Sequence, residues 1–363
     1  MDVAVIGTGF IGKQHIEAIR RVPGARLVAV CEPNEAVAKQ LSQAMEIPRY
    51  YTTVEDMLAQ EPNLQVVHNC TPSSFHFAIN QQLISAGVNV YCEKPFTSNT
   101  EQSAILVQQL AESGLKGGVN FNYRHNLMVE EMRERVADGS IGRPWFVNTE
   151  YLQDWLLKQT DYDWRVDAEI GGLTRAIADI GSHCFDTLQY ILGQHIVSVE
   201  VKRLQEYATR FRNGQEVPVS NEDAAIIFVT FEDGLSGLIR VSQVSAGKKN
   251  DLHVLVEGQK QALEWYQERP DRLWIGHRDQ GNEELYAASQ YLHGQAAADA
   301  ELPNGHAVGW KDAFTAGIQA FYDDVNGRPS AGYVDFAEAD YLMRLVDACV
   351  VSDAQQKTIQ LQG

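Results

Sequence analysis

Short apolar runs alternate with amphipathic stretches over about the first 120 residues of the chain. The runs that predict strands are Val3–Ile6, Leu27–Cys31, Val66–Cys70, Val88–Cys92 and Gly118–Phe121. The helical patterns between them begin near Ile11, Asn34, Thr53, Ser74 and Asn99. Because strands that alternate with helices pair in parallel, residues 1–122 are predicted to form an α/β domain whose parallel sheet is linked by crossover helices.

The pattern changes after about Tyr123, where a helix over Leu127–Ala137 is followed by stretches of strict alternation. These predict strands over Trp145–Tyr151, Val197–Leu204, Ala224–Phe231, Leu235–Val244, Leu252–Glu257 and Ala262–Tyr266. The Asp233-Gly234 pair predicts a tight hairpin. Further helices are expected over Ile177–Leu192, Lys311–Asn326 and Phe336–Gln355. Residues 123–363 are therefore predicted to form an α+β domain with a mostly antiparallel sheet.

Composition narrows the classes of partner and compartment. With 363 residues, 44% of them hydrophobic, the chain can bury two cores. The net charge of −18 argues against nucleic acid or an anionic membrane as partner. The five cysteines are odd in number and never spaced CxxC, which is typical of reduced thiols. No apolar run reaches membrane-spanning length and Met1 leads directly into a strand, so we expect a cytoplasmic protein.

A glycine-rich hexapeptide follows the first predicted strand. It reads Gly7-Thr8-Gly9-Phe10-Ile11-Gly12 and fits GxGxxG between a strand and a helix. Such a turn lets the backbone approach a pyrophosphate, which the N–H groups of the following helix can bind. Glu32 closes the second strand, where a carboxylate can accept both ribose hydroxyls of NAD. No Arg or Lys follows to neutralise a 2′-phosphate, so NAD is favoured over NADP; the alternative reading of Glu32 is a solvated strand end.

Three further segments contain side chains suited to ligand binding or catalysis. Thr71-Pro72, with His76 nearby, and Glu93-Lys94-Pro95 each follow a strand at the carboxyl edge of the predicted sheet, where ligands bind. Proline restricts Lys94 and allows a cis bond. Asp179 and His183 are four residues apart and are expected on one helical face, so the carboxylate can orient a general-base imidazole. A lysine at a sheet edge or a DxxxH pair is also common as a solvated or purely structural feature.

Taken together and in this order, the motifs resemble the Gfo/Idh/MocA family, which includes glucose–fructose oxidoreductases and inositol dehydrogenases. The resemblance rests on Gly7–Gly12, Thr71-Pro72 with His76, Glu93-Lys94-Pro95, the run from Asn120 to Arg124, and Asp179 with His183. It implies a Rossmann domain, a second domain with an open mixed sheet, and a homodimer or homotetramer built through that sheet. It assigns Lys94, Asp179 and His183 to catalysis on a sugar or polyol ring alcohol, and Glu93 and Asn122 to seating the cofactor.

Other residues are expected to face the substrate. They are Tyr123, the pair Trp164-Arg165 that leads into 169–172, and His306 in a loop rich in proline and glycine. Ordinary core or interface packing is the alternative reading for these stretches. The chain lacks a cluster of Arg and Lys near Asp179, which favours a neutral sugar, anhydrosugar or cyclitol over a sugar phosphate. The remaining histidines are read as structural or solvated: His15, His68, His125, His195, His253, His277 and His293.

Three alternatives to a dehydrogenase are compatible with parts of the sequence. An NAD-dependent glycosidase of the same fold would oxidise its substrate only transiently. A nucleotide-sensing binding protein would have no need for Lys94, Asp179 and His183 together. A metal site at Asp179, His183, Cys184 and Asp186, or a zinc alcohol dehydrogenase, is disfavoured because no second His–Cys cluster has ligand spacing. No metal is therefore expected.

Overall fold

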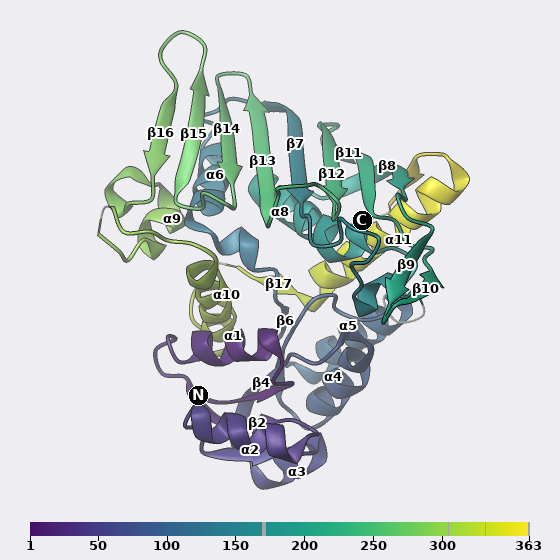
Figure 1. The fold of residues 1–363 in the computed structure, drawn as a ribbon. Helices are drawn as coiled ribbons and strands as arrows, with labels where there is room; N and C mark the ends of the chain where they lie inside the picture. The colour runs from purple at the N-terminus through teal and green to yellow at the C-terminus, as the bar shows by residue number, and fades with distance from the viewer. Residues whose placement is uncertain (169–171, 304, 331, 362–363) are drawn as a thin grey trace. The chain divides into compact units, whose positions relative to one another are not determined.

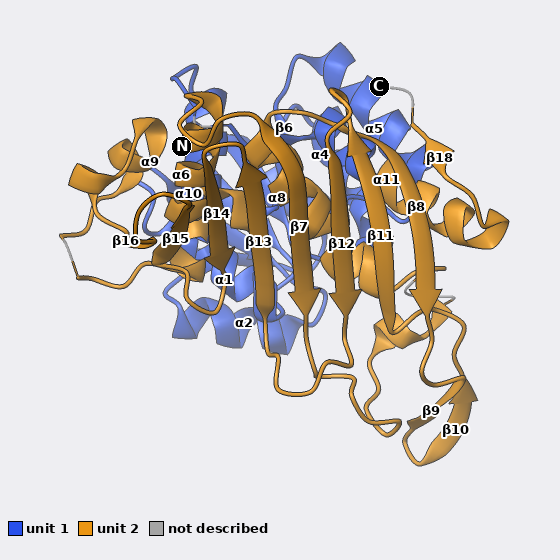
Figure 2. Cartoon of the chain, turned by 90° about the horizontal axis from the view of Figure 1, so that it is seen from above, with its two compact units in different colours: residues 1–122, 314–343 blue, residues 123–313, 344–363 orange. Residues whose placement is uncertain are grey.

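The chain divides into two compact units in a computed structural model that describes residues 1–168, 172–303, 305–330 and 332–361 (Figure 1). Unit 1 contains residues 1–122 and 314–343, and unit 2 contains residues 123–313 and 344–363 (Figure 2). The sequence predicted all of residues 123–363 in the second domain. The structure differs there, because residues 314–343 belong to unit 1.

Unit 1 is built on a seven-stranded sheet in the order β17-β6-β5-β4-β1-β2-β3. All neighbours are parallel except β17, which runs antiparallel to β6. Val3, Val5, Val66 and Val90 are fully buried, as expected for strands covered by helices on both faces. The strands are β1 (Asp2–Ile6), β2 (Arg26–Cys31), β3 (Arg49–Tyr51), β4 (Leu64–Asn69), β5 (Asn89–Cys92), β6 (Gly117–Val119) and β17 (Val334–Asp335).

The crossover helices begin close to the predicted positions. They are α1 (Phe10–Ile19), α2 (Glu35–Ala44), α3 (Val54–Gln60), α4 (His76–Ser85) and α5 (Thr100–Ser113). The side chains of Asn34, Thr53 and Asn99 each accept a hydrogen bond from the backbone N–H three residues on, which satisfies a free donor of the first turn. The start predicted near Ser74 is a 3-10 turn, Ser73–Phe75, that leads into α4.

Aromatic packing explains why residues 314–343 join unit 1. The ring of Phe321 lies 5.1 Å from that of Tyr91 in β5. Gly118 in β6 has no side chain, and an added Cβ there would lie 2.9 Å from the Tyr91 ring and 3.0 Å from Phe321. The rings of Tyr91 and Phe321 thus fill the space beside Gly118, and β17 pairs with the edge of β6. The helices that carry this segment are α10 (Trp310–Val325) and α11 (Phe336–Gln355).

Unit 2 contains a nine-stranded sheet in the order β16-β15-β14-β13-β7-β12-β11-β8-β18. Only β7 and β12 pair in parallel, so the sheet is mixed and mostly antiparallel, as predicted. Figure 2 displays its strands side by side. They are β7 (Pro144–Leu152), β8 (Ile196–Leu204), β11 (Ala224–Phe231), β12 (Ser236–Ser242), β13 (Asp251–Gly258), β14 (Gln261–Tyr266), β15 (Arg272–His277), β16 (Glu283–Tyr286) and β18 (Ile359–Gln360).

One face of this sheet is buried and the other is open to solvent. In β11, Ala225, Ile227 and Val229 are buried, whereas Ile226 and Phe228 between them are exposed. The helices of unit 2 include α6 (Leu127–Ala137), α8 (Ser182–Leu192) and the short α9 (Gly294–Asp299). A two-stranded ribbon is formed by β9 (Thr209–Arg212) and β10 (Gln215–Pro218). Within the described ranges, no helix is long and apolar enough to span a membrane.

Candidate active site

The glycine turn after β1 has the shape that a dinucleotide needs. Gly7 has a φ of +86°, and a Cβ there would lie 2.7 Å from the Cys70 carbonyl carbon. A Cβ on Gly12 would lie 2.0 Å from the Gly7 oxygen, so only glycine permits this packing of α1 on β1. A Cβ on Gly9 would meet nothing within 4 Å. No side chain caps the start of α1, so the space and the N–H groups fit a pyrophosphate.

Glu32 lies beside this turn, as predicted for a ribose-binding acid. Its Oε2 accepts a 2.8 Å hydrogen bond from the Thr8 hydroxyl, and its Oε1 accepts one of 3.3 Å from the Asn34 N–H. Thr8 is buried, whereas Phe10 at the start of α1 is 77% exposed. The carboxylate is half-buried and can exchange these donors for the hydroxyls of a ribose.

His76 links the two loops that were predicted to border the nicotinamide. Its Nε2 lies 2.8 Å from the Thr71 carbonyl oxygen, and its Nδ1 lies 2.8 Å from that of Pro95. Burial lowers the pKa of His76, and the hydrogen bonds to these two carbonyls oppose the shift. The ring is only 1% exposed, whereas Pro72 beside Thr71 faces solvent. His76 is therefore suited to hold the loops in place, and Thr71 and Pro72 are the more accessible members of this group.

The Glu93-Lys94-Pro95 segment leaves β5 with its carboxylate buried and its Lys94–Pro95 peptide bond cis. Burial raises the pKa of Glu93, but hydrogen bonds from His15 and Asn120 and the charge of Lys94 lower it below its usual range. Lys94 is half-buried. The Asn122 amide nitrogen is buried and has no hydrogen-bond partner among the described residues, so it is a donor that a bound cofactor could satisfy.

Asp179 lies in a π-helical turn, Ile177–Gly181, that precedes α8. The regular α-helix expected over Ile177–Leu192 is therefore interrupted at the predicted catalytic acid, as is frequent at functional sites. The Asp179 Oδ2 accepts a 2.9 Å hydrogen bond from Gln243, and its Oδ1 lies 3.6 Å from the Nε of Arg165. The Arg165 guanidinium in turn lies 4.4 Å from the centre of the Trp164 ring. The predicted Trp164-Arg165 pair thus lies at the predicted catalytic carboxylate.

His183 is buried on α8 between two tyrosine rings. Its ring centre lies 4.9 Å from that of Tyr123 and 6.1 Å from that of Tyr151. The Tyr151 hydroxyl donates to the side-chain Oδ1 of Asn250 at 2.6 Å, and the Asn250 Nδ2 donates to the Tyr123 hydroxyl at 2.8 Å. A 2.8 Å contact between the two hydroxyls closes the ring of hydrogen bonds. Burial raises the pKa of both tyrosines, so they stay neutral and form a fixed polar wall beside the imidazole.

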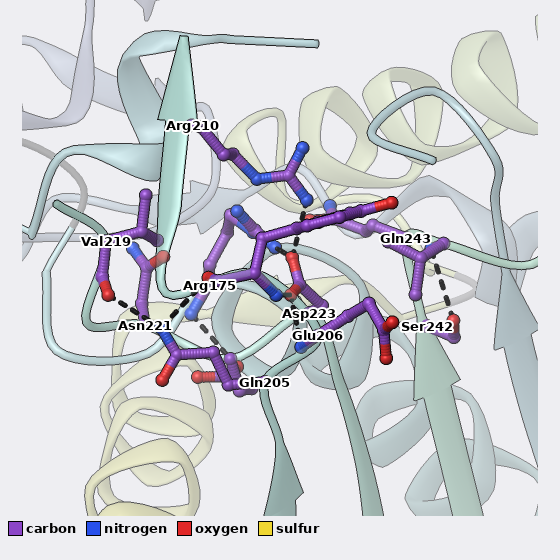
Figure 3. A network of polar contacts seen from close by, with 12 residues as sticks. Arg175, Gln205, Glu206, Arg210, Val219, Asn221, Asp223, Ser242 and Gln243 are labelled. Atoms are coloured by element: carbon purple, nitrogen blue, oxygen red, sulfur yellow. Dashed lines mark hydrogen bonds and ion pairs between the residues drawn. The ribbon is translucent and has the colours of Figure 1, made fainter. Parts of the chain in front are cut away.

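Figure 3 displays a buried network of polar contacts around Asp223, which the sequence did not predict. Asp223 Oδ1 accepts from Arg210 at 2.7 Å and from Arg175, and both guanidinium groups are fully buried. The backbone N–H of Gln243 donates to the Asp223 carbonyl at 3.0 Å. Glu222 accepts from the N–H groups of Arg175 and Ile177, both at 3.0 Å. The network therefore fixes the segment that enters the π-helical turn and the backbone of Gln243.

The remaining predicted residues are His306, the rest of the two substrate-side motifs and the disfavoured metal ligands. His306 is exposed, and its Nδ1 lies 2.9 Å from the Pro303 carbonyl. Residues 169–171 and 304 of the two substrate-side motifs lie outside the described residues. Of the disfavoured metal ligands, Asp186 pairs with Arg124, and burial raises the pKa of Cys184 to about 12. In the part of the chain that the structure describes, no group of three His, Cys, Asp or Glu side chains could hold a metal.

Comparison with family models covers most of the chain. Residues 1–121 match the model described as "Oxidoreductase family, NAD-binding Rossmann fold", and residues 129–264 match the "GFO/IDH/MocA C-terminal domain". The chain belongs to the Gfo/Idh/MocA family of oxidoreductases. The resemblance drawn from its motifs and the predicted NAD-binding Rossmann domain are thereby confirmed.

Relatives of this oxidoreductase include enzymes named for sugars and cyclitols. The chain is 25% identical to levoglucosan dehydrogenase of Pseudarthrobacter phenanthrenivorans, with 99% of this chain and 97% of the relative covered. It is 26% identical to the scyllo-inositol 2-dehydrogenase (NAD(+)) of Bacillus subtilis, covering 67% of each. A structure of levoglucosan dehydrogenase with NADH and L-sorbose superposes with a TM-score of 0.92 at 22% identity, covering 100% of this chain and 99% of the other. That likeness establishes the shared fold.

Proposed function

We propose that the chain is an NAD-dependent dehydrogenase that oxidises a secondary ring alcohol of a neutral sugar, anhydrosugar or cyclitol. The observation that carries this proposal is the Asp179 carboxylate, held by Gln243 and Arg165 on the π-helical turn that leads into buried His183. An acid held next to a histidine-bearing helix is suited to base catalysis on an alcohol. The names of the relatives support the substrate class, since they include levoglucosan, scyllo-inositol and D-apiose dehydrogenases.

The roles of the three proposed catalytic residues follow from their chemistry. His183 takes the proton of the substrate hydroxyl, Asp179 stabilises the imidazolium that results, and Lys94 stabilises the negative charge that develops on the oxygen. NAD, when bound, accepts the hydride from the carbinol carbon. The products are a ketone, the reduced nicotinamide and the proton on His183, so atoms and electrons balance.

The cofactor seat is proposed to consist of the glycine turn (Gly7, Thr8, Gly9, Phe10, Ile11 and Gly12), Glu32, Thr71, Pro72, His76, Glu93, Lys94 and Asn122. Glu32 favours NAD, because a carboxylate accepts ribose hydroxyls and repels the 2′-phosphate of NADP. Substrate contacts are proposed for Tyr123, Trp164, Arg165 and His306 beside the catalytic groups. The buried, hydrogen-bonded hydroxyl of Tyr123 favours contact through its ring. The exposed aromatic Trp164 is suited to stack on the apolar face of a sugar, and Arg165 to donate to its hydroxyls.

A homodimer or homotetramer built on the open face of the unit 2 sheet is part of the proposal. On the open face of strand β11, Phe228 is 57% exposed and Ile226 is 36% exposed. Large apolar side chains on a sheet face favour burial against a second copy of the chain.

A panel assay tests the function. Purified protein is mixed with NAD or NADP and with neutral sugars, anhydrosugars, inositols and glycosides, and the absorbance of reduced nicotinamide is followed. Steady NADH formation with one class of polyol is expected, and NADP should be the poorer cofactor. Release of free sugar from a glycoside without net NADH would instead establish the glycosidase alternative. Bound NAD with no turnover of any compound would favour the sensor.

A pair of variants tests whether His183 acts in catalysis. His183→Asn is expected to lower kcat by at least about 100-fold, because general base catalysis contributes about that much. NAD affinity should stay within about threefold of wild type. His195→Asn is the matched control, since His195 is an exposed histidine of the same unit. Loss of NAD binding with retained turnover in His183→Asn would contradict the assignment.

A further inference from the structure

A chain of hydrogen bonds crosses the core of unit 1. The Tyr322 hydroxyl on α10 lies 2.7 Å from His68 Nε2 in β4. His68 Nδ1 lies 2.7 Å from His15 Nδ1 on α1, and His15 Nε2 lies 2.9 Å from Glu93 Oε1 at the end of β5. Both histidines are 0% exposed, Tyr322 is 1% exposed and Glu93 is 6% exposed. This hydrogen-bond chain therefore connects α10, β4, α1 and the end of β5 through side chains that are shielded from solvent.

Hydrogen-bond chemistry gives this chain a direction. A carboxylate only accepts, so His15 Nε2 must carry the proton that faces Glu93. When His15 is neutral, its Nδ1 accepts from His68 Nδ1–H, which leaves His68 Nε2 to accept from the Tyr322 hydroxyl. Every contact then has one donor and one acceptor. The reverse direction would leave the buried Tyr322 proton without an acceptor among the described residues, which is costly. Burial and the nearby His15 lower the pKa of His68 well below its usual value, which agrees with a neutral ring.

The hydrogen-bond chain ends at the carboxylate of Glu93, the residue before Lys94. Glu93 Oε1 also accepts a 2.6 Å hydrogen bond from the Asn120 amide, and Oε2 accepts one of 3.1 Å from the backbone N–H of Lys94. Three donors thus fix both oxygens of the carboxylate and the backbone of the lysine. Other titratable groups face Glu93 from neighbouring elements: Cys70 after β4, Cys92 in β5 and His76 on α4.

We propose that His15 is a positioning residue for Lys94, acting through Glu93 at the end of a one-way hydrogen-bond chain that starts at Tyr322 and passes through His68. This inference rests on the proposed catalytic role of Lys94. The chain keeps Glu93 a fixed carboxylate in the core, and the carboxylate holds the Lys94 backbone. An apolar residue would fill the same core space, as Val66 and Val67 do in β4, but it could not supply the donor.

Histidine nitrogen NMR tests the chain independently of activity. Protein labelled with ¹⁵N-histidine is examined between pH 6 and 8, with His15→Gln and His68→Asn used for assignment. We expect a neutral His15 with its proton on Nε2 and a neutral His68 with its proton on Nδ1. A doubly protonated His15, or a His68 proton on Nε2, would overturn the direction. Because no substrate is present, this result does not depend on the proposed function.

Kinetics test the positioning role. His15→Leu is expected to lower kcat by about tenfold or more, because a hydrogen bond to a charged group is lost. With fewer donors the pKa of Glu93 rises, so the acid limb of the kcat profile should move to higher pH. His15→Gln should restore most of the rate, since its amide can donate to Glu93 and accept from His68. Tyr322→Phe, at the far end, should have a smaller effect.

A matched control separates positioning from stability. Ser42→Ala removes a buried 2.7 Å hydrogen bond to the Ile47 carbonyl in the same unit. It should lower the melting temperature without moving the pH profile. If His15→Leu changes only the melting temperature, as Ser42→Ala does, His15 is a core residue and the positioning role is refuted. Wild type that forms no NADH with any polyol would instead refute the proposed function, while the NMR result stands.

Discussion

Replacing Gln243 by Leu tests whether the Asp179 carboxylate must be held in place for turnover. Gln243 is fully buried, and its amide donates to Asp179 at 2.9 Å, whereas Arg165 lies farther away at 3.6 Å and is partly exposed. A hydrogen bond to a charged group contributes about 1.5–3 kcal/mol. If that energy is needed in the transition state, kcat falls by about 10- to 150-fold. The distant Arg165 cannot replace it, because a partly exposed ion pair contributes less.

The assay is the pH dependence of kcat and KM, with NAD affinity measured by fluorescence titration. In Gln243→Leu, NAD affinity should be unchanged and kcat should fall. Gln189→Met is the control, because Gln189 accepts a buried 2.9 Å hydrogen bond from the Ile196 N–H in the same unit. It should lower the melting temperature but not kcat. A Gln243→Leu enzyme with kcat within about threefold of wild type would refute the reasoning.

Further predictions concern the glycine turn and the buried ions. Gly12→Ala places a Cβ 2.0 Å from the Gly7 oxygen, so NAD affinity in a fluorescence titration should fall at least about tenfold; unchanged affinity would contradict this fit. Asp223→Leu leaves two buried arginines without their carboxylate, which should cost about 3–5 kcal/mol, or roughly 6–20 °C in calorimetry, and a fall of under about 3 °C would contradict it. Burial raises the pKa of Asp223, but its arginine and backbone donors lower it below its usual value. Its stabilisation is thus present above the unfolded-state pKa and is lost as pH falls through the folded-state pKa, so the deficit of Asp223→Leu should shrink in acid; a constant deficit would be evidence against this.

Periodicity was sufficient to predict most of the fold. Alternation in β11 and β12 and the Asp233-Gly234 turn predicted a hairpin that the structure confirms. The strands β15 and β16 were missed, because the apolar run of β15 is only a few residues long and β16 consists mostly of charged residues. The return of residues 314–343 to unit 1 depends on contacts such as that of Phe321 with Tyr91, which are far apart in the sequence. A local pattern contains no information on such pairs.

For the candidate site too, local sequence patterns could be predicted, whereas contacts between distant elements could not. The glycine turn could be located because GxGxxG is a local pattern between a strand and a helix, and Glu32 could be singled out because it closes the next strand. Gln243 could not be predicted, since it meets Asp179 only through the pairing of distant elements. His15 and His68 were read only as structural or solvated; both are fully buried, and their mutual contact, which leads to Glu93, is seen only in the folded structure. Buried polar side chains on separate strands and helices are the kind of feature that a linear reading misses.

Isotope transfer tests the central claim most directly. The polyol that gives NADH in the panel is prepared with deuterium at the carbon that is oxidised, and the nicotinamide formed is analysed by mass spectrometry. We expect one deuterium in each reduced nicotinamide and an equal amount of ketone. Reduced nicotinamide without deuterium, or loss of the label to water with no net reduction of NAD, would contradict it.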